Sequence, residues 1–176
     1  RRPGMYIGST DQRGLQHLVY EITYNSIDEA MAGCCTKIIV SLQADGAVRV
    51  EDNGRGIPVE THPTTNISAL ETVMTTLHSG AKFGGKAYPV SGGLHGVGAS
   101  VVNALSSWLK VNVKRDGKLY QQEYRQGIPQ GEVTEVGEAS GTGTTITFLA
   151  DEEIFGKTEY DFKALSERLR EMAYLN

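Results

Sequence analysis

Apolar residues recur at helical spacing over a long stretch near the start of the chain. Between residues 15 and 32 they fall on one side of a helix, at Leu15, Leu18, Val19, Ile22 and Ala30. Thr10 or Asp11 is placed to cap the start of this helix, and Gly33 is a natural end. The pattern therefore predicts one long helix with a single core-facing stripe.

Three shorter helical patterns follow. Residues 68–77 and 99–105 each predict a helix, and residues 160–175 predict a closing amphipathic helix. The inward-facing residues of the first and last of these are Leu70, Val73, Met74 and Leu77, and Phe162, Leu165, Leu169 and Met172. Residues 1–8, rich in Gly and Pro, predict an irregular surface segment, and residues 78–89 predict a long loop.

Period-two alternation predicts two hairpins and further strands. The hairpins are residues 37–42 with 47–52 around Asp45-Gly46, and residues 108–114 with 118–125 around Asp116-Gly117. A further strand pair is predicted from residues 132–136 and 144–148, the second with Thr144, Ile146 and Phe148 on a common face. Helices and strands thus alternate along the whole chain.

Length and composition fit a single globular domain over residues 1–176. Of its 176 residues, 39% are hydrophobic and 22% charged, which is enough for one substantial core. The formal net charge is −4, so a broad phosphate-neutralising surface is not expected. If DNA is a partner, we expect other parts of a longer protein to hold it.

The cysteines and the chain ends bear on compartment and completeness. Cys34 and Cys35 are adjacent, which suits neither a disulfide framework nor a zinc site and indicates a reducing compartment, the cytoplasm by default. The sequence has no secretion leader and no apolar run long enough for a membrane span. Because the chain opens at Arg1 and stops directly after a helical pattern, we expect a fragment of a longer protein.

The most glycine-rich run lies directly before a predicted helix. Residues 91–98 contain four glycines among eight positions and lead into residues 99–105. Glycine lets the backbone approach a ligand closely, and a helix beginning there adds the positive pole of its dipole. The run predicts an anion-binding site, above all for phosphates. A flexible linker is the alternative, which Leu94 and Val97 inside the turn disfavour.

Two stretches place polar groups beside core-facing positions. On the first predicted helix, Glu21, Asn25 and Asp28 form one row that borders the apolar stripe, so we expect Glu21 to be half-buried. An ordinary solvated row is the alternative. Asp52 extends the core-facing row of the strand over residues 47–52. The alternative for Asp52 is an Asx-type turn in which it caps its own backbone.

Together these stretches supply what a nucleotide needs. The carboxylate of Asp52 can accept a hydrogen bond from an exocyclic amine, which adenine has, whereas the guanine carbonyl would be repelled. That favours ATP over GTP. Asn25 can present an oxygen to Mg²⁺, which takes few protein ligands, and Glu21 can deprotonate a water for attack on the γ-phosphate.

Four ordered motifs resemble those of the GHKL (Bergerat-fold) ATPases. They are Glu21-x-x-x-Asn25-x-x-Asp28, Asp52-Asn53-Gly54-Arg55-Gly56, Gly92-Gly93-Leu94-His95-Gly96-Val97-Gly98 and Thr142-Gly143-Thr144. The opening residues 2–8, the Leu94-His95 insertion and Asn103-Ala104-Leu105-Ser106 are similar to the ATPase domains of bacterial type IIA DNA topoisomerases, of the gyrase B or ParE type. The resemblance implies an α/β two-layer sandwich: a mixed, mostly antiparallel sheet with helices on one face.

The resemblance also implies roles for individual residues. Glu21 would be the general base, Asn25 the Mg²⁺ ligand, and Asp52 the adenine reader through a water shared with Thr144. Arg55 would lie over the base and pair with Glu29, while ATP-competitive inhibitors would reach a residue at the pocket rim, Arg115. The other nucleotide-binding positions would be Ile22, Asp28, Val50, Gly56, Ile57, Pro58, Met74, Lys82, Gly93, Leu94, His95, Gly96, Val97, Gly98, Ala99 and Ile146.

For a longer protein the resemblance implies an ATP-driven homodimer that gates passage of a DNA segment, with a DNA-cleaving partner subunit of the gyrase A or ParC type.

Two departures from the family pattern stand out. Tyr24 occupies a position where an acid is expected, and we expect the swapping N-terminal arm and the following domain to lie outside residues 1–176. We therefore expect the fragment to bind ATP, to stay mostly monomeric and to hydrolyse ATP slowly.

Other interpretations remain open. A GHKL clamp of the mismatch-repair or chaperone type is disfavoured by Met5-Tyr6-Ile7-Gly8 and by the Leu94-His95 spacing. A module that binds nucleotide without hydrolysis is a further alternative. His17, His62 and His78 have no evident partner in the sequence and are interpreted as structural or exposed residues, whereas His95 is expected to shape its loop.

Overall fold

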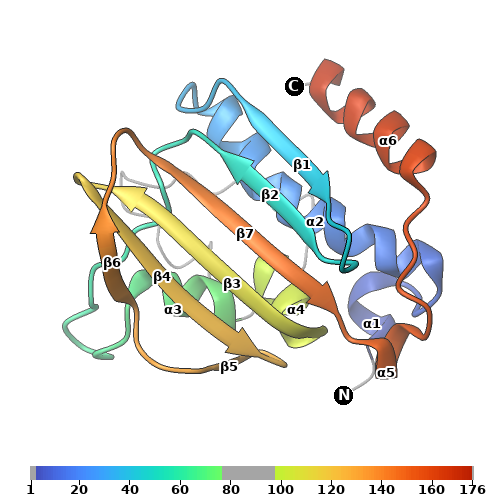
Figure 1. The fold of residues 1–176 in the computed structure, drawn as a ribbon, viewed down its shortest axis with the longest axis horizontal. Coiled ribbons are helices and arrows are strands. Elements are labelled where there is room, and N and C mark those ends of the chain that lie inside the picture. The colour runs from blue at the N-terminus through green and yellow to red at the C-terminus, as the bar shows by residue number, and fades with distance from the viewer. Residues whose placement is uncertain (1–2, 77–97, 176) are drawn as a thin grey trace.

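The computed structural model describes residues 3–76 and 98–175. In this part of the chain the strands form one sheet, in the order β1-β2-β7-β3-β4-β5 with β6 also paired to β4 (Figure 1). Every pairing is antiparallel. The strands are β1 (Ile38–Leu42), β2 (Val48–Asp52), β3 (Ser106–Arg115), β4 (Lys118–Arg125), β5 (Ile128–Pro129), β6 (Thr134–Glu138) and β7 (Gly143–Ala150).

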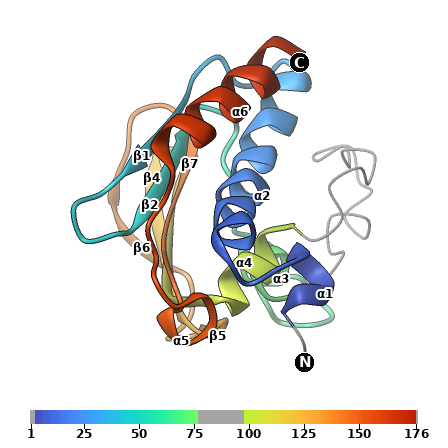
Figure 2. The ribbon, with the colours of Figure 1, turned by 90° about the vertical axis from the view of Figure 1, so that its right-hand side faces the viewer.

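Helices cover one face of this sheet (Figure 2). The covering helices are α2 (Gln12–Met31), α3 (Ala69–Thr75) and α4 (Gly98–Ala104); the others are α1 (Gly4–Ile7), α5 (Glu152–Phe155) and α6 (Phe162–Leu175). The arrangement confirms the predicted two-layer α/β fold. None of the described helices combines the length and apolar character needed to span a bilayer.

The longest helix, α2, is the centre of the helical layer. Asp11 caps its start, because its side chain accepts hydrogen bonds from the amides of Arg13 and Gly14. The predicted apolar stripe is buried and belongs to the same core cluster as the inner side chains of the sheet: Leu15, Leu18, Val19, Ile22, Val48, Val50 and Phe148. Burial of each such side chain contributes about 1.5–3 kcal/mol. The polar row beside the stripe is thereby fixed against β2 and β7.

Two predicted core positions are wrong. Ala30 is exposed, as is the adjacent Met31, because the last turn of α2 runs beyond the core. Phe162 is 70% exposed. It is the first residue of α6, and side chains tilt toward the N-terminus of a helix, so its ring projects beyond the packed surface. Farther along α6, Leu165 and Met172 are buried as predicted.

The predicted pairing of residues 132–136 with 144–148 is also wrong. The second segment forms β7, which inserts between β2 and β3, whereas the first lies in part in β6, which pairs with β4. Thr144, Ile146 and Phe148 are all buried in this interior strand, while β6 is exposed throughout. The short helix α1 was missed because four residues show no periodicity.

Candidate functional site

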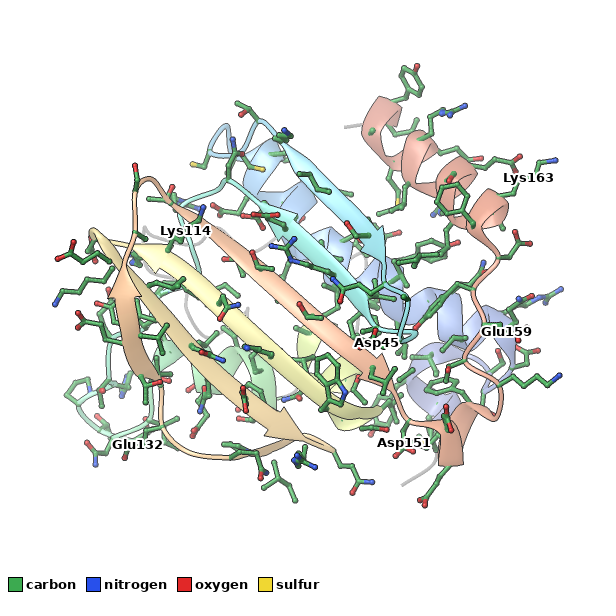
Figure 3. The ribbon with its side chains drawn as sticks, viewed as in Figure 1. Asp45, Lys114, Glu132, Asp151, Glu159 and Lys163 are labelled. Carbon is green, nitrogen blue, oxygen red and sulfur yellow. The ribbon has the colours of Figure 1, made fainter. Side chains whose placement is uncertain are left out.

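A pocket lies between α2 and the strands β2 and β7. Its lining residues are Ile22, Asn25, Ser26, Glu29, Val50, Asp52, Ile57, Thr144 and Ile146. It sits at the end of the sheet where β2 stops and β7 starts, close to Lys114, which pairs with Gly143 (Figure 3). Asp45 marks the hairpin turn at the opposite end of β2 (Figure 3). Every lining residue except Ser26 was expected from the sequence.

Asp52 ends β2 and is only 7% exposed. In the sheet it lies opposite Thr144 of β7. The two strands approach closely here because Gly143, at a φ of 155°, has no side chain: a Cβ at this position would collide with the carbonyl oxygen of Asp52. This approach brings the Thr144 amide to 3.3 Å from Asp52 Oδ1.

Three donors bind the carboxylate of Asp52. Oδ1 accepts from the amide of Gly54 at 2.9 Å and from the amide of Thr144 at 3.3 Å, while Oδ2 accepts from Ser26 Oγ at 2.6 Å. The bond from Gly54 is an Asx-type turn, so Asp52 does cap its own backbone, but the bonds from Ser26 and Thr144 show that it is more than a local cap. A carboxylate has about four acceptor positions. Among residues 3–76 and 98–175, one position on Oδ2 therefore stays available to a donor in the pocket.

Apolar side chains surround this acceptor. Ile22, Val50, Ile57 and Ile146 are all buried and line the pocket. Ile57 is held in place because its amide donates to Thr144 Oγ1 at 3.0 Å. An open acceptor on a buried carboxylate between apolar walls suits a flat, apolar ring that carries an amine.

An ion pair closes the side of the pocket. Arg55 donates to the buried carboxylate of Glu29 through Nη2 at 2.7 Å, through Nε at 3.2 Å and through its own amide at 2.9 Å. The predicted pairing of Arg55 with Glu29 is therefore present. Arg115 Nη1 donates to the carbonyl of Gly56 at 2.9 Å and so fixes the loop that carries Ile57.

Glu21 lies nearer the N-terminus of α2, does not line the pocket, and is more buried than expected, at 3% exposure. Oε2 accepts from the amide of Gly98, the first residue of α4, at 3.0 Å, and Oε1 lies 3.0 Å from Nε2 of His17. His17 precedes Glu21 by four residues and therefore lies one turn away on the same side of α2. The interpretation of His17 as a residue without a partner is wrong, and this spacing was the signal that pointed to the pair.

The described residues fit a lightly coordinated magnesium ion. Asn25 lines the pocket and carries an amide oxygen, a ligand type that Mg²⁺ accepts. Within residues 3–76 and 98–175, no group of three or more His, Cys, Asp or Glu is arranged to hold a metal ion. Since Mg²⁺ keeps several waters, a single amide ligand agrees with that finding. Asp28 is half-buried on α2 and does not line the pocket.

The remaining predicted residues divide into two groups. Pro58 is half-buried, and Met74 and Ala99 are buried, but none of the three lines the pocket. The others lie outside the described residues: Lys82, Gly93, Leu94, His95, Gly96 and Val97. Ser26 is the pocket residue that the sequence reasoning missed. It directly follows Asn25, and no spacing rule separates it from an ordinary helical serine.

The sequence matches the model of a known family. The model of the histidine kinase-, DNA gyrase B-, and HSP90-like ATPases matches residues 10–154. The chain belongs to this ATPase family. The matched residues include all of α2, β2 and β7 and the loop that carries Ile57, and hence every residue that lines the pocket.

Within this ATPase family the chain is similar to gyrase B proteins. It is 62% identical over 176 residues to the DNA gyrase B protein of Borrelia hermsii, covering 100% of the chain and 28% of that protein. It is 59% identical over 174 residues to the DNA gyrase B protein of Thermotoga maritima, covering 99% of the chain and 27% of that protein. The chain thus spans about a quarter of the length of these relatives.

A solved structure supports the same fold. The crystal structure of the 43K ATPase domain of Thermus thermophilus gyrase B in complex with an aminocoumarin superposes with a TM-score of 0.87 at 46% sequence identity. The match covers 99% of the chain and 44% of that structure. The resemblance to GHKL ATPases and to the gyrase B type is confirmed.

Proposed function

We propose that residues 1–176 are the N-terminal ATPase domain of a type II DNA topoisomerase of the gyrase B type, which binds and hydrolyses ATP. The observation that carries this proposal is the single open acceptor of Asp52 in an apolar pocket. The adenine amine would donate to Asp52 Oδ2, and the purine ring would lie between Ile57 and Ile146. The Thr144 hydroxyl, which accepts from the Ile57 amide, would take part through a shared water.

The same acceptor disfavours guanine. A guanine carbonyl in the position of the adenine amine would face a carboxylate oxygen at close range, without a proton between them. Such a buried repulsion is worth more than a solvent-exposed one because little water screens it. We therefore expect ATP to bind in preference to GTP.

Hydrolysis would take place around Glu21. Its carboxylate is positioned by His17 and by the Gly98 amide, so it can hold and deprotonate a water. Asn25 would ligate Mg²⁺, which when bound neutralises charge on the phosphates. Lys82 and residues 93–99 would contact the phosphates, and Arg55, Pro58, Met74 and Arg115 would contribute around the base.

In the longer protein we propose a homodimer that closes on ATP, works with a DNA-cleaving subunit of the gyrase A type in the cytoplasm, and leaves most DNA contacts to other domains. ATP-competitive inhibitors would bind the same pocket; the solved relative from Thermus thermophilus was crystallised with an aminocoumarin. The identities to gyrase B favour this role over a mismatch-repair or chaperone clamp.

The test is a binding and turnover measurement on the chain and on Glu21→Ala. The chain should bind ATP with Mg²⁺ in titration calorimetry and release phosphate slowly, and Glu21→Ala should keep binding while losing turnover. If the folded variant lost binding instead, Glu21 would be a binding residue. If the wild-type chain bound no ATP, the proposed function would be wrong.

A further inference from the structure

Ser26 makes a contact that the proposed function does not yet use. Its Oγ donates to Asp52 Oδ2 at 2.6 Å, and both residues are buried, with Ser26 only 3% exposed. A hydroxyl bonded to a carboxylate at this distance forms a short, charge-assisted hydrogen bond. The bond joins α2 to the end of β2 across the floor of the pocket.

This geometry is unusual for a helical hydroxyl. A serine or threonine inside a helix commonly donates to the carbonyl four residues earlier. Thr23, also buried on α2, does so, with Oγ1 at 2.7 Å from the carbonyl of Val19. Ser26 instead donates across to the strand, which directs its only proton to the acid that faces the pocket.

The direction of that proton determines which hydrogen-bonding groups in the pocket face a purine base. Oδ1 of Asp52 is filled by the two amides of Gly54 and Thr144, so Ser26 takes one of the two positions left on Oδ2. The other position is then fixed in place as an acceptor. Because the Ser26 proton is engaged, the hydroxyl cannot turn to donate to a carbonyl.

We propose that Ser26 is a specificity-determining residue of the ATP site. It positions the free acceptor of Asp52 for the amine of adenine and withholds from guanine the hydroxyl donor that its carbonyl would need. This role rests on the proposed function and names the group that sets base selectivity at that site. Ser26 acts on the nucleotide through Asp52 and is therefore a positioning residue.

The central variant is Ser26→Ala. The space left by the hydroxyl admits a water with two protons, of which one can bind Asp52 and the other a guanine carbonyl. Titration calorimetry with ATP and with GTP should show ATP affinity about fivefold to tenfold lower, the size of one ordinary hydrogen bond, because the water replaces part of the bond to Asp52. The ratio of ATP to GTP affinity should fall by at least the same factor.

Two further variants separate positioning from general packing. Ser26→Thr keeps the hydroxyl and should restore the preference for ATP. Thr23→Val removes a buried hydroxyl from the same helix without touching the pocket and should leave both affinities within about twofold, since it loses only a bond within α2. Circular dichroism checks the fold, and Ser26→Cys, a weaker donor of similar shape, replaces the alanine variant if that variant is unfolded.

The outcomes distinguish this inference from the proposed function. If the wild type binds ATP and Asp52→Asn does not, but Ser26→Ala keeps full affinity and selectivity, the role of Ser26 is wrong and the ATP site stands. Equal losses in Ser26→Ala and Thr23→Val would also overturn it, because packing would then explain both. Failure of the wild type to bind ATP would overturn both proposals together.

Discussion

Two buried carboxylates of the pocket region differ in what holds them. Asp52 is bound by two backbone amides and one hydroxyl, none of which titrates near neutral pH. Glu21 is bound by one amide and by a histidine, and the amide belongs to the first residue of α4. The first arrangement is an acceptor fixed at a strand end by backbone and hydroxyl donors, whereas the second pairs an acid with a basic side chain one turn away on the same helix.

This difference indicates that different turns of α2 serve binding of the base and hydrolysis of ATP. Ser26 and Glu29 on its later turns are bonded to Asp52 and Arg55, and so serve to shape the base pocket. Glu21, more than one turn earlier, has partners of its own. Changes at Asp52 should therefore affect binding, and changes at Glu21 should affect turnover.

The largest effect is expected for Glu21→Gln. The amide keeps the shape but cannot accept a proton, so kcat should fall about 100-fold to 10,000-fold, the range of general-base catalysis. The affinity for ATP should change by less than about threefold. Phosphate release measures kcat and titration calorimetry measures ATP affinity on the same sample. If both fell by the same factor, Glu21 would not differ in role from Asp52.

The next effect in size is expected for Asp52→Asn. The amide gives up one acceptor and presents N–H groups to the adenine amine, so ATP affinity should fall about 100-fold, consistent with losing a charged acceptor and leaving donors unmatched. Glu51→Gln is the matched control, since Glu51 precedes Asp52 and points to the other face of β2. Calorimetry in which both variants bind equally well would exclude Asp52 as the base reader.

A smaller effect is expected for His17→Ala. The Glu21 carboxylate would keep the Gly98 amide but lose its second partner, so we expect kcat to fall about tenfold with little change in ATP affinity. His62→Ala serves as control because His62 is exposed and its ring accepts from the amide of Thr64 instead of contacting a carboxylate. Steady-state rates for both variants check the expectation. If the two rates were equal, His17 would have no role in hydrolysis.

The smallest effect concerns stability. Arg55→Ala leaves the buried Glu29 with the backbone amide of residue 55 but without the guanidinium, which should cost about 1–2 kcal/mol, or about 2–8 °C in Tm. Arg49→Ala breaks a more exposed pair with Glu51 and should cost less than about 0.5 kcal/mol. Thermal unfolding monitored by circular dichroism compares the two, and a larger loss at Arg49 would contradict the argument.

The fold was predictable where local patterns decide it. The α2 stripe, its cap at Asp11 and the two hairpins follow from periodicity and turn residues, and the structure has them. The insertion of β7 between β2 and β3 was not predictable, because pairing partners distant in sequence leave no local mark. The exposure of Phe162 depends on where α6 starts, which periodicity fixes only loosely.

The candidate site shows the same division. Asp52 and Glu21 stood out because acids beside core-facing positions need partners. The identity of those partners depended on three-dimensional packing in the case of Ser26, which approaches Asp52 only because α2 crosses β2 at this point. The partner of Glu21 was within reach of the sequence, since His17 precedes it by four residues on one helix.

The most direct test of the central claim is a crystal structure of the chain with Mg²⁺ and a non-hydrolysable ATP analogue. We predict that the adenine amine lies within hydrogen-bonding distance of Asp52 Oδ2, with Ser26 still donating to the same carboxylate. A purine bound elsewhere, or bound in the pocket with its amine turned away from Asp52, would contradict the account.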